Sequence, residues 1–344
     1  MFGFGKKSLV GVDIGTASIK LVELSKINGH LNLDTYGIAQ LTYSASLAPE
    51  NSPLAVTIKT LGELMRRAGV KTKKIVASLP TSTVFVTVIN IPKVSAKQQR
   101  KTIEYEAKKI IPIPIEDVTV SWNLIPSADN KDMTGKDSVL LTAVPNHVIA
   151  NYIKVFQELK LEPEAIEVEA TALTRSLIGQ DTSTVLIVDV GSKTSTVNLI
   201  DGGYIYFSKN INVGGEAITQ SMAQMLNINL QRAEQFKRSL GLSGLTEDRN
   251  IPKALQPTLN LVRDEIEQVL HLSQGRGRGV EKIIITGGGA KLLGLDKYLA
   301  GFNIPVALGN PWARVMVPEK IKPMVDEVGP GLSVAIGLAM RQDA

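Results

Sequence analysis

Residues 10–24 read VGVDIGTASIKLVEL and decide the fold of this chain. They predict two short β-strands rich in Val, Ile and Leu, joined by a turn that carries an acid, a glycine and hydroxyl side chains. Residues 185–200, VLIVDVGSKTSTVNLI, repeat this pattern with the same spacing. The repeat aligns Asp13, Gly15, Thr16 and Ser18 with Asp189, Gly191, Ser192 and Thr194. Both copies continue into a further turn and a third strand, which predicts a duplicated α/β domain.

Two such hairpins that face each other would form an anion site. Their turns present backbone N–H groups and hydroxyls to an anion, and the two acids could hold a hydrated Mg²⁺ between them. A nucleoside triphosphate with its metal fits this description. The alternative is that two ordinary turns share a composition, since Asp, Gly, Ser and Thr are common turn residues. A third segment favours a site, because residues 287–294, GGGAKLLG, follow a strand and are expected to open a helix.

Composition excludes several classes of protein. The 344 residues are 44% hydrophobic and 21% charged, as is usual for a globular chain of roughly two to four subdomains. The chain has no cysteine and three scattered histidines, so disulfides and thiolate or histidine metal sites are not expected. The net charge of +5 is spread out, which argues against nucleic-acid binding. No apolar run approaches the roughly 18 residues of a membrane span. We expect a cytoplasmic protein without direct membrane insertion.

The order of the predicted elements divides the chain into lobes. Residues 83–162 predict a β-α-β-β-α series with a polar loop at 127–137, which indicates a small inserted α+β subdomain. The insertion interrupts the first half of the duplication. The predicted boundaries are 1–82 and 163–181 for the first lobe, 83–162 for the insertion, and 182–344 for the second lobe, with a helical subdomain at about 215–280 and a closing helix at 329–341.

Several motifs resemble the actin-like ATPase superfamily. DIGTASIK and VDVGSKTST resemble its two phosphate motifs, IIITGGGAKLLGL its adenosine motif, and GPGLSVAIGLAMR its closing connecting helix. AEQFK, at residues 233–237, resembles the AExxK of bacterial actin homologues. Within the superfamily, the opening strands, IPIPIEDV, EVEATALTRS and GNPWARV are similar to the PilM family of type IV pilus assembly proteins, in the branch that also contains FtsA. The position of the insertion agrees with this branch.

The resemblance implies a two-lobed actin-like ATPase fold around a nucleotide cleft that takes ATP and Mg²⁺. The residues implied to contact the phosphates are Gly15, Thr16, Ala17, Ser18 and Lys20 from one side and Gly191, Ser192, Lys193 and Thr194 from the other. Asp13 and Asp189 would lie near Mg²⁺, through water. The residues implied on the nucleoside side are Glu234, Lys237, Gly287, Gly288, Gly289 and Lys291. The second motif departs from the glycine-rich DxGGGT of active relatives, so the backbone cradle is expected to be less open.

A single acid is the candidate catalytic residue. Glu169 lies where chaperone relatives carry a Glu that positions the attacking water, and a carboxylate there could orient water or act as a base. The alternative is that Glu169 only caps the following helix. We expect ATP hydrolysis to be slow or absent.

The resemblance also implies a function and partners. It implies a cytoplasmic scaffold of the type IV pilus inner-membrane platform, recruited by the N-terminal tail of PilN, with PilO, reached through PilN, and the assembly ATPase as further partners. A groove between the insertion and the first lobe is expected to receive the tail as an extended peptide, with strand 83–92 beside helix 96–110. The alternative role of the insertion is self-association. Two rival functions stay open: an FtsA-like cell-division filament protein, and a small-molecule kinase, for which only Asp34 and Glu63 offer a base.

Overall fold

The computed structural model describes residues 7–42, 52–126, 136–242, 252–275 and 279–343. Its first sheet has the strand order β14-β3-β2-β1-β4-β8. The antiparallel meander predicted from residues 10–24 forms its centre, and two parallel strands follow on one side. The bounds are β1 Lys7–Ile14, β2 Ser18–Ile27, β3 His30–Gln40, β4 Lys74–Leu79, β8 Glu162–Val168 and β14 Val315–Met316.

The second sheet repeats the first. Its order is β11-β10-β9-β12-β13, in which β9, β10 and β11 form the meander and β12 runs parallel to β9 as β4 does to β1. The registers correspond as well, since Asp13 pairs with Lys20 and Asp189 pairs with Thr196. The bounds are β9 Val185–Val190, β10 Ser195–Asp201, β11 Tyr204–Ile211, β12 Lys282–Thr286 and β13 Val306–Leu308. The predicted duplicated α/β fold is confirmed.

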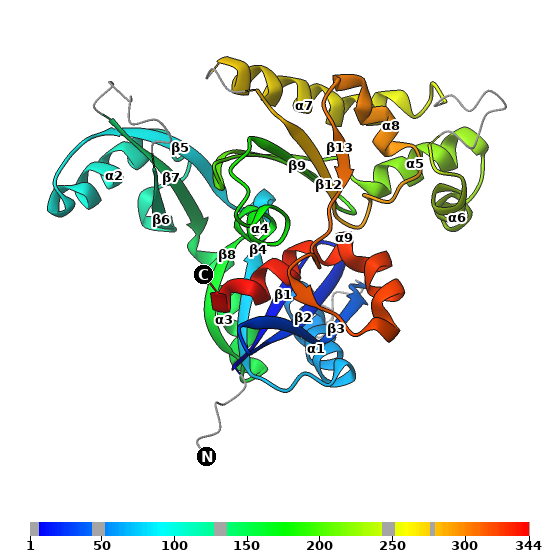
Figure 1. Cartoon of the computed structure of the whole chain (residues 1–344), viewed down its shortest axis with the longest axis horizontal. Coiled ribbons are helices and arrows are strands. Elements are labelled where there is room, and N and C mark those ends of the chain that lie inside the picture. The colour runs from blue at the N-terminus through cyan, green and yellow to red at the C-terminus, as the bar shows by residue number, and fades with distance from the viewer. Residues whose placement is uncertain (1–6, 43–51, 127–135, 243–251, 276–278, 344) are drawn as a thin grey trace.

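Helices cover the two sheets (Figure 1). The sequence explains where helix α1 begins and ends. Ser52 accepts a hydrogen bond from the amide of Ala55 at its start, and Gly69 ends it in the left-handed conformation with φ +66°. Its inner side buries Leu61 and Leu64. The bounds are α1 Pro53–Ala68, α4 Glu169–Leu173 with a π-helical continuation Thr174–Ile178, α5 Gly215–Leu226, α6 Leu230–Leu240, α7 Gln256–Gly275, α8 Leu295–Leu299 and α9 Lys322–Ala339.

The insertion forms a separate three-stranded sheet with its own core, at the left of Figure 1. The strand order is β5-β7-β6, and helix α2 packs Ile103 and Ala107 against Ile91, Val139 and Leu141. The bounds are β5 Phe85–Pro92, α2 Ala96–Ile110, β6 Val118–Ile125 and β7 Lys136–Pro145. Most of the polar loop predicted at 127–137 lies outside the described residues.

The last helix predicted for the insertion packs elsewhere. Helix α3, Asn146–Glu158, buries Val155 and Phe156 in the core of the first sheet, together with Leu61 and Leu64 of α1. The reason is its apolar side, which continues the hydrophobic surface of α1 rather than that of α2. The core of the insertion therefore ends at β7, and the predicted limit at residue 162 does not follow the packing.

The C-terminal segment also returns to the first sheet. Strand β14 pairs with β3, and α9 buries Leu332, Ala335 and Ile336 against Val22 and Leu24 of β2. The predicted closing helix of 329–341 begins earlier, at Lys322 with Pro323 in its first turn, and it ends at Ala339; Pro330 lies inside it. Residues 182–344 are thus divided between the two sheets.

Helix α9 crosses between the sheets and touches the backbone of α4. On its other side, Val334 and Leu338 share a hydrophobic cluster with strands of the second sheet. A Cβ on Gly337 would lie 1.9 Å from the carbonyl oxygen of Ala172 in α4, so only glycine permits this approach. Among the described residues, no helix is both long enough and apolar enough to cross a membrane.

Candidate functional site

The two repeated turns face each other across one pocket. In the first turn the amide of Gly15 donates to the carbonyl of Ser18 at 3.0 Å, and in the second the amide of Gly191 donates to the carbonyl of Thr194 at 3.0 Å. The predicted residues that line the pocket are Asp13, Gly15, Thr16, Ala17, Ser18, Lys20, Glu169, Asp189, Gly191, Ser192, Thr194, Gly287 and Gly288. The structure therefore brings together both halves of the duplication, as the sequence predicts.

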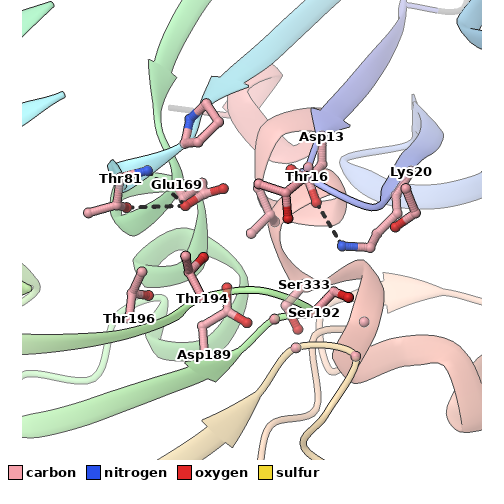
Figure 2. Close-up of a pocket in the computed structure, with 18 of the residues that line it drawn as sticks. Asp13, Thr16, Lys20, Thr81, Glu169, Asp189, Ser192, Thr194, Thr196 and Ser333 are labelled. Carbon is pink, nitrogen blue, oxygen red and sulfur yellow. Dashed lines mark hydrogen bonds and ion pairs between the residues drawn. The ribbon is translucent and has the colours of Figure 1, made fainter. Parts of the chain in front are cut away.

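Asp13 and Lys20 form a fixed ion pair on one wall of the pocket (Figure 2). Asp13, only 3% exposed, accepts from Lys20 Nζ at 3.1 Å and from the hydroxyl of Ser78 at 3.0 Å. Burial alone would lower the pKa of Lys20. Attraction to Asp13, Asp189 and Glu169 and the hydrogen bond to Asp13 outweigh burial, so the pKa of Lys20 is raised. Lys20 is therefore a permanent cation in the pocket.

Two further carboxylates approach the same space, Glu169 and Asp189 (Figure 2). Burial, followed by repulsion from Asp13 and Asp189, raises the pKa of Glu169 to about 8, although hydrogen bonds from Thr81 act in the opposite sense. Burial also raises the pKa of Asp189 to about 6, where attraction to Lys20 opposes it and repulsion from Asp13 adds to it. Three acids thus face one lysine, an arrangement that favours an added cation.

The acids do not form a closed metal site by themselves. In the described parts of the chain, no group of three His, Cys, Asp or Glu side chains is arranged to hold an ion. Mg²⁺ commonly keeps several waters and takes one or two carboxylates together with phosphate oxygens. Asp13 and Asp189 suit such water-mediated binding, because they lie on equivalent strands of the two sheets.

The stability of the protein without ligand is expected to fall as the pH rises from about 5 to 8. The folded-state pKa values of Glu169 and Asp189 exceed their ordinary values. The folded state therefore binds more protons than the unfolded state over this range, and this contribution is lost as the pH passes through the folded-state pKa. Urea unfolding at pH 5.5 and 8.0, in EDTA, measures the effect. Glu169→Gln should flatten the dependence, and an equal slope in that variant would contradict the assignment.

The glycine-rich segment after β12 lies very close to the backbone of β9. Gly287 has φ +90°, and a Cβ there would lie 2.1 Å from Oδ1 of Asp189 and 2.5 Å from the carbonyl oxygen of Val190. The amide of Gly289 donates to that same carbonyl at 2.8 Å. The expected helix does not open at these glycines: α8 begins only at Leu295, because Gly287 and Gly294 both adopt positive φ. The segment instead forms one wall beside Asp189.

Glu234 and Lys237 lie outside the pocket lining and tie two helices together. Lys237 Nζ donates to Glu234 at 2.6 Å, to Thr219 at 2.8 Å and to the carbonyl of Gly215 at 2.9 Å. The amide of Gly215 in turn donates to the carbonyl of Gly191. The pair thereby supports the second turn through α5, and its contact with a nucleoside stays a prediction.

The remaining predicted residues also lie outside the lining. Lys193 and Lys291 are exposed, and a Cβ on Gly289 would collide with the side chain of Val190. Lys193 is close in sequence to lining residues on both sides but is not itself among them. Their roles toward a ligand stay predictions.

The structure adds pocket residues that the sequence analysis did not identify. They are Pro80, Thr81, Ser82, Leu173, Thr196, Asn210, Pro330, Gly331, Ser333 and Val334. A signal existed for Thr81 and Ser82, since hydroxyl residues follow directly on the buried strand β4 beside β1. Glu216 was also missed: it accepts from the hydroxyl of Ser192 at 2.8 Å.

Comparisons with known proteins agree with this geometry. The solved PilM-PilN type IV pilus biogenesis complex contains a chain with TM-score 0.81 and 24% identity, covering 97% of this chain and 98% of that one. MreB5 of Spiroplasma citri bound to AMPPNP has TM-score 0.52 and 14% identity, covering 96% of this chain and 94% of that one. These structures share the actin-like ATPase fold.

Curated relatives include cell-division proteins. FtsA of Enterococcus hirae is 22% identical, over 88% of this chain and 78% of that protein. FtsA of Enterococcus faecalis is 23% identical over 67% of this chain, which spans only 58% of that relative's length. The family model described as type IV pilus assembly protein PilM matches residues 11–343, nearly the whole described chain. The chain therefore belongs to the PilM family of type IV pilus assembly proteins, in the FtsA-like branch of the actin-like ATPase superfamily.

Proposed function

We propose that the chain binds ATP with Mg²⁺ between its two turns and serves as a scaffold of the pilus assembly platform, held at the inner membrane by the cytoplasmic N-terminal tail of PilN. The observation that carries the nucleotide proposal is the pocket itself, where two equivalent glycine-containing turns face each other beside three carboxylates and one lysine. The MreB5 neighbour, whose structure contains AMPPNP, supports it. The solved PilM-PilN complex supports the choice of partner.

The residues fit a metal-bound triphosphate. Lys20 supplies a cation, and the amides and hydroxyls of the turns, including Ser18 and Ser192, supply donors to phosphate oxygens. Asp13 and Asp189 would accept hydrogen bonds from the waters of the metal. Mg²⁺, when bound, offsets the excess negative charge of the acids and phosphates.

Slow hydrolysis is part of this proposal. It is supported by the second turn, which reads DVGSKTS and lacks the consecutive glycines of active relatives. Glu169 lines the pocket, and its role as the residue that orients the attacking water stays a proposal. The kinase alternative has less support, because Asp34 and Glu63 are absent from the pocket lining and Glu63 pairs with Arg67 on α1.

Calorimetry with the full chain tests the nucleotide site. We expect ATP to bind more tightly with Mg²⁺ than in EDTA, and steady-state turnover to stay well below one per second without a partner. A folded protein that takes up no ATP would overturn the proposal, and several turnovers per second would refute a nucleotide-stabilised scaffold.

The insertion offers an edge for the PilN tail. Strand β5, the expected partner strand, lies against β11 of the second sheet. Strand β6 instead forms the other edge of the insertion's sheet, with β7 as its neighbour and with Leu124 46% exposed. An extended peptide that adds to such an edge gains main-chain hydrogen bonds, and apolar side chains give selectivity. In this proposal, PilO is reached through PilN, and the assembly ATPase is a further partner.

Leu124→Asp is expected to weaken binding of a synthetic PilN tail peptide at least about tenfold, because a charge replaces an apolar contact. Fluorescence anisotropy measures the affinity, and ATP binding should be unchanged. Leu261→Asp, at a leucine of α7 that is also exposed (54%), serves as the matched control. Equal peptide affinity in both variants would place the tail on another surface.

A further inference from the structure

Thr81 joins the nucleotide pocket to the insertion. Strands β4 and β8 are parallel neighbours with Leu79 opposite Val168, so the residues after their carboxyl ends meet at the same edge of the sheet. The Oε2 atom of Glu169 there accepts from both the amide and the hydroxyl of Thr81, each at 3.1 Å. Thr81 is 8% exposed. Figure 2 shows this pair on the side of the pocket opposite Lys20.

Only a short turn separates Thr81 from the first strand of the insertion. Thr81 begins a 3-10 turn, Thr81–Thr83, and β5 starts at Phe85. The amide and the hydroxyl of Thr83 both donate to the carbonyl of Pro80, at 2.9 and 2.8 Å. Glu169 thus accepts the first amide of a short, internally bonded turn that leads directly into the first strand of the insertion. A displacement of this carboxylate would release the start of β5.

The same turn also contacts the second sheet. The turn and β5 both lie against β11, whose Asn210 lines the pocket. Val86 and Val88 of β5 belong to the same hydrophobic cluster as Ile205 of β11. The start of β5 is therefore held on one side by Glu169 and on the other by a strand of the second sheet.

We propose that Thr81 is a positioning residue that couples occupancy of the nucleotide pocket to the insertion through Glu169. A metal-bound nucleotide would draw the Glu169 carboxylate toward its water shell and away from Thr81, so the turn and the start of β5 loosen. The loosened β5 changes the affinity of the insertion for its peptide. By linkage, the bound peptide changes the affinity for the nucleotide by the same factor. This inference rests on the proposed function, since it needs both a nucleotide in the pocket and a partner on the insertion.

Hydrogen–deuterium exchange of the full chain, with and without Mg-AMPPNP, tests the coupling. In the natural protein we expect the amides of residues 81–88 to exchange at least about threefold faster when the ligand is bound, because Glu169 would release two hydrogen bonds, from the amide and the hydroxyl of Thr81. Thr81→Val removes the hydroxyl and keeps the shape. Its free form should already exchange faster, and the ligand should add less than in the natural protein, because only the amide bond to Glu169 is left to lose. Thr81→Ser keeps the hydroxyl and should restore the natural response.

A second readout separates coupling from a merely structural role. Calorimetry on the same samples gives Mg-AMPPNP affinity with and without the PilN tail peptide. The peptide should change that affinity in the natural protein and in Thr81→Ser, and should change it less in Thr81→Val. An unchanged exchange response, or equal linkage in the folded Thr81→Val variant, would overturn the coupling alone. Failure of the natural protein to bind Mg-AMPPNP would instead overturn the proposed function, and the coupling with it.

Discussion

Replacing Gly337 by alanine is expected to lower the free energy of unfolding by about 3 kcal/mol or more. The added Cβ would lie 1.9 Å from the carbonyl oxygen of Ala172 and 2.6 Å from its carbonyl carbon. Both atoms belong to the backbone of α4, so no side chain can rotate away, and α9 and α4 must separate. Because α9 packs against both sheets, the strain reaches both cores. Urea unfolding followed by circular dichroism measures the loss.

The same helix supplies the control. A Cβ on Gly331 of α9 would meet no atom closer than 3.7 Å, which is ordinary van der Waals contact. Gly331→Ala should therefore leave stability unchanged or raise it by up to about 1 kcal/mol, since alanine favours a helix over glycine. Equal stability of the two variants would contradict the prediction, because it would show that α9 and α4 can accommodate a Cβ at Gly337 without loss of stability.

The central hairpins were predictable because their signals are local. The strand-turn-strand of residues 10–24 carries its own alternation and turn residues, and the copy at 185–200 carries the same ones. The structure closes both turns with the same hydrogen bond, from Gly15 to Ser18 and from Gly191 to Thr194. Residues within one such segment fix each other's geometry. For this reason the two turns beside Asp13 and Asp189 were predictable. That the turns face each other was inferred from the repeat, and the structure brings Asp13, Lys20 and Asp189 to one pocket.

Packing partners distant in the chain were not predictable. The apolar side of α3 could have covered either the insertion or α1, and only the fold shows that Phe156 joins Leu61. The closing helix was expected at 329–341 from its motif alone, whereas α9 begins at Lys322 and runs through Pro330. Asn210 and Ser333 reach the pocket from two elements that share no motif. Whether these residues line the pocket depends on the order of the strands and on helix packing, which cannot be read from a single sequence.

Asp189→Asn is expected to weaken Mg-ATP binding by about 10- to 100-fold, the usual range for a partner outside the direct ligands of a metal. Asparagine keeps the size of the side chain, which packs tightly against Gly287: a Cβ on Gly287 would lie 2.1 Å from Oδ1 of Asp189. It removes the charge that would orient the waters of Mg²⁺. Calorimetry of the purified chain with ATP, in Mg²⁺ and in EDTA, measures both affinities. Asp296→Asn, an exposed acid on α8, is the matched control.

The direction in which Asp189→Asn changes ATP affinity in EDTA distinguishes a role in metal binding from a role in packing. Without metal, Asp189 repels phosphate, and it shares the pocket with Asp13 and Glu169. Removing one negative charge should then leave ATP affinity unchanged or increase it, while the gain produced by Mg²⁺ nearly disappears. A loss of equal size in Mg²⁺ and in EDTA would mean that the substitution only distorts the pocket. Unchanged Mg-ATP affinity in a folded variant would remove Asp189 from the metal site.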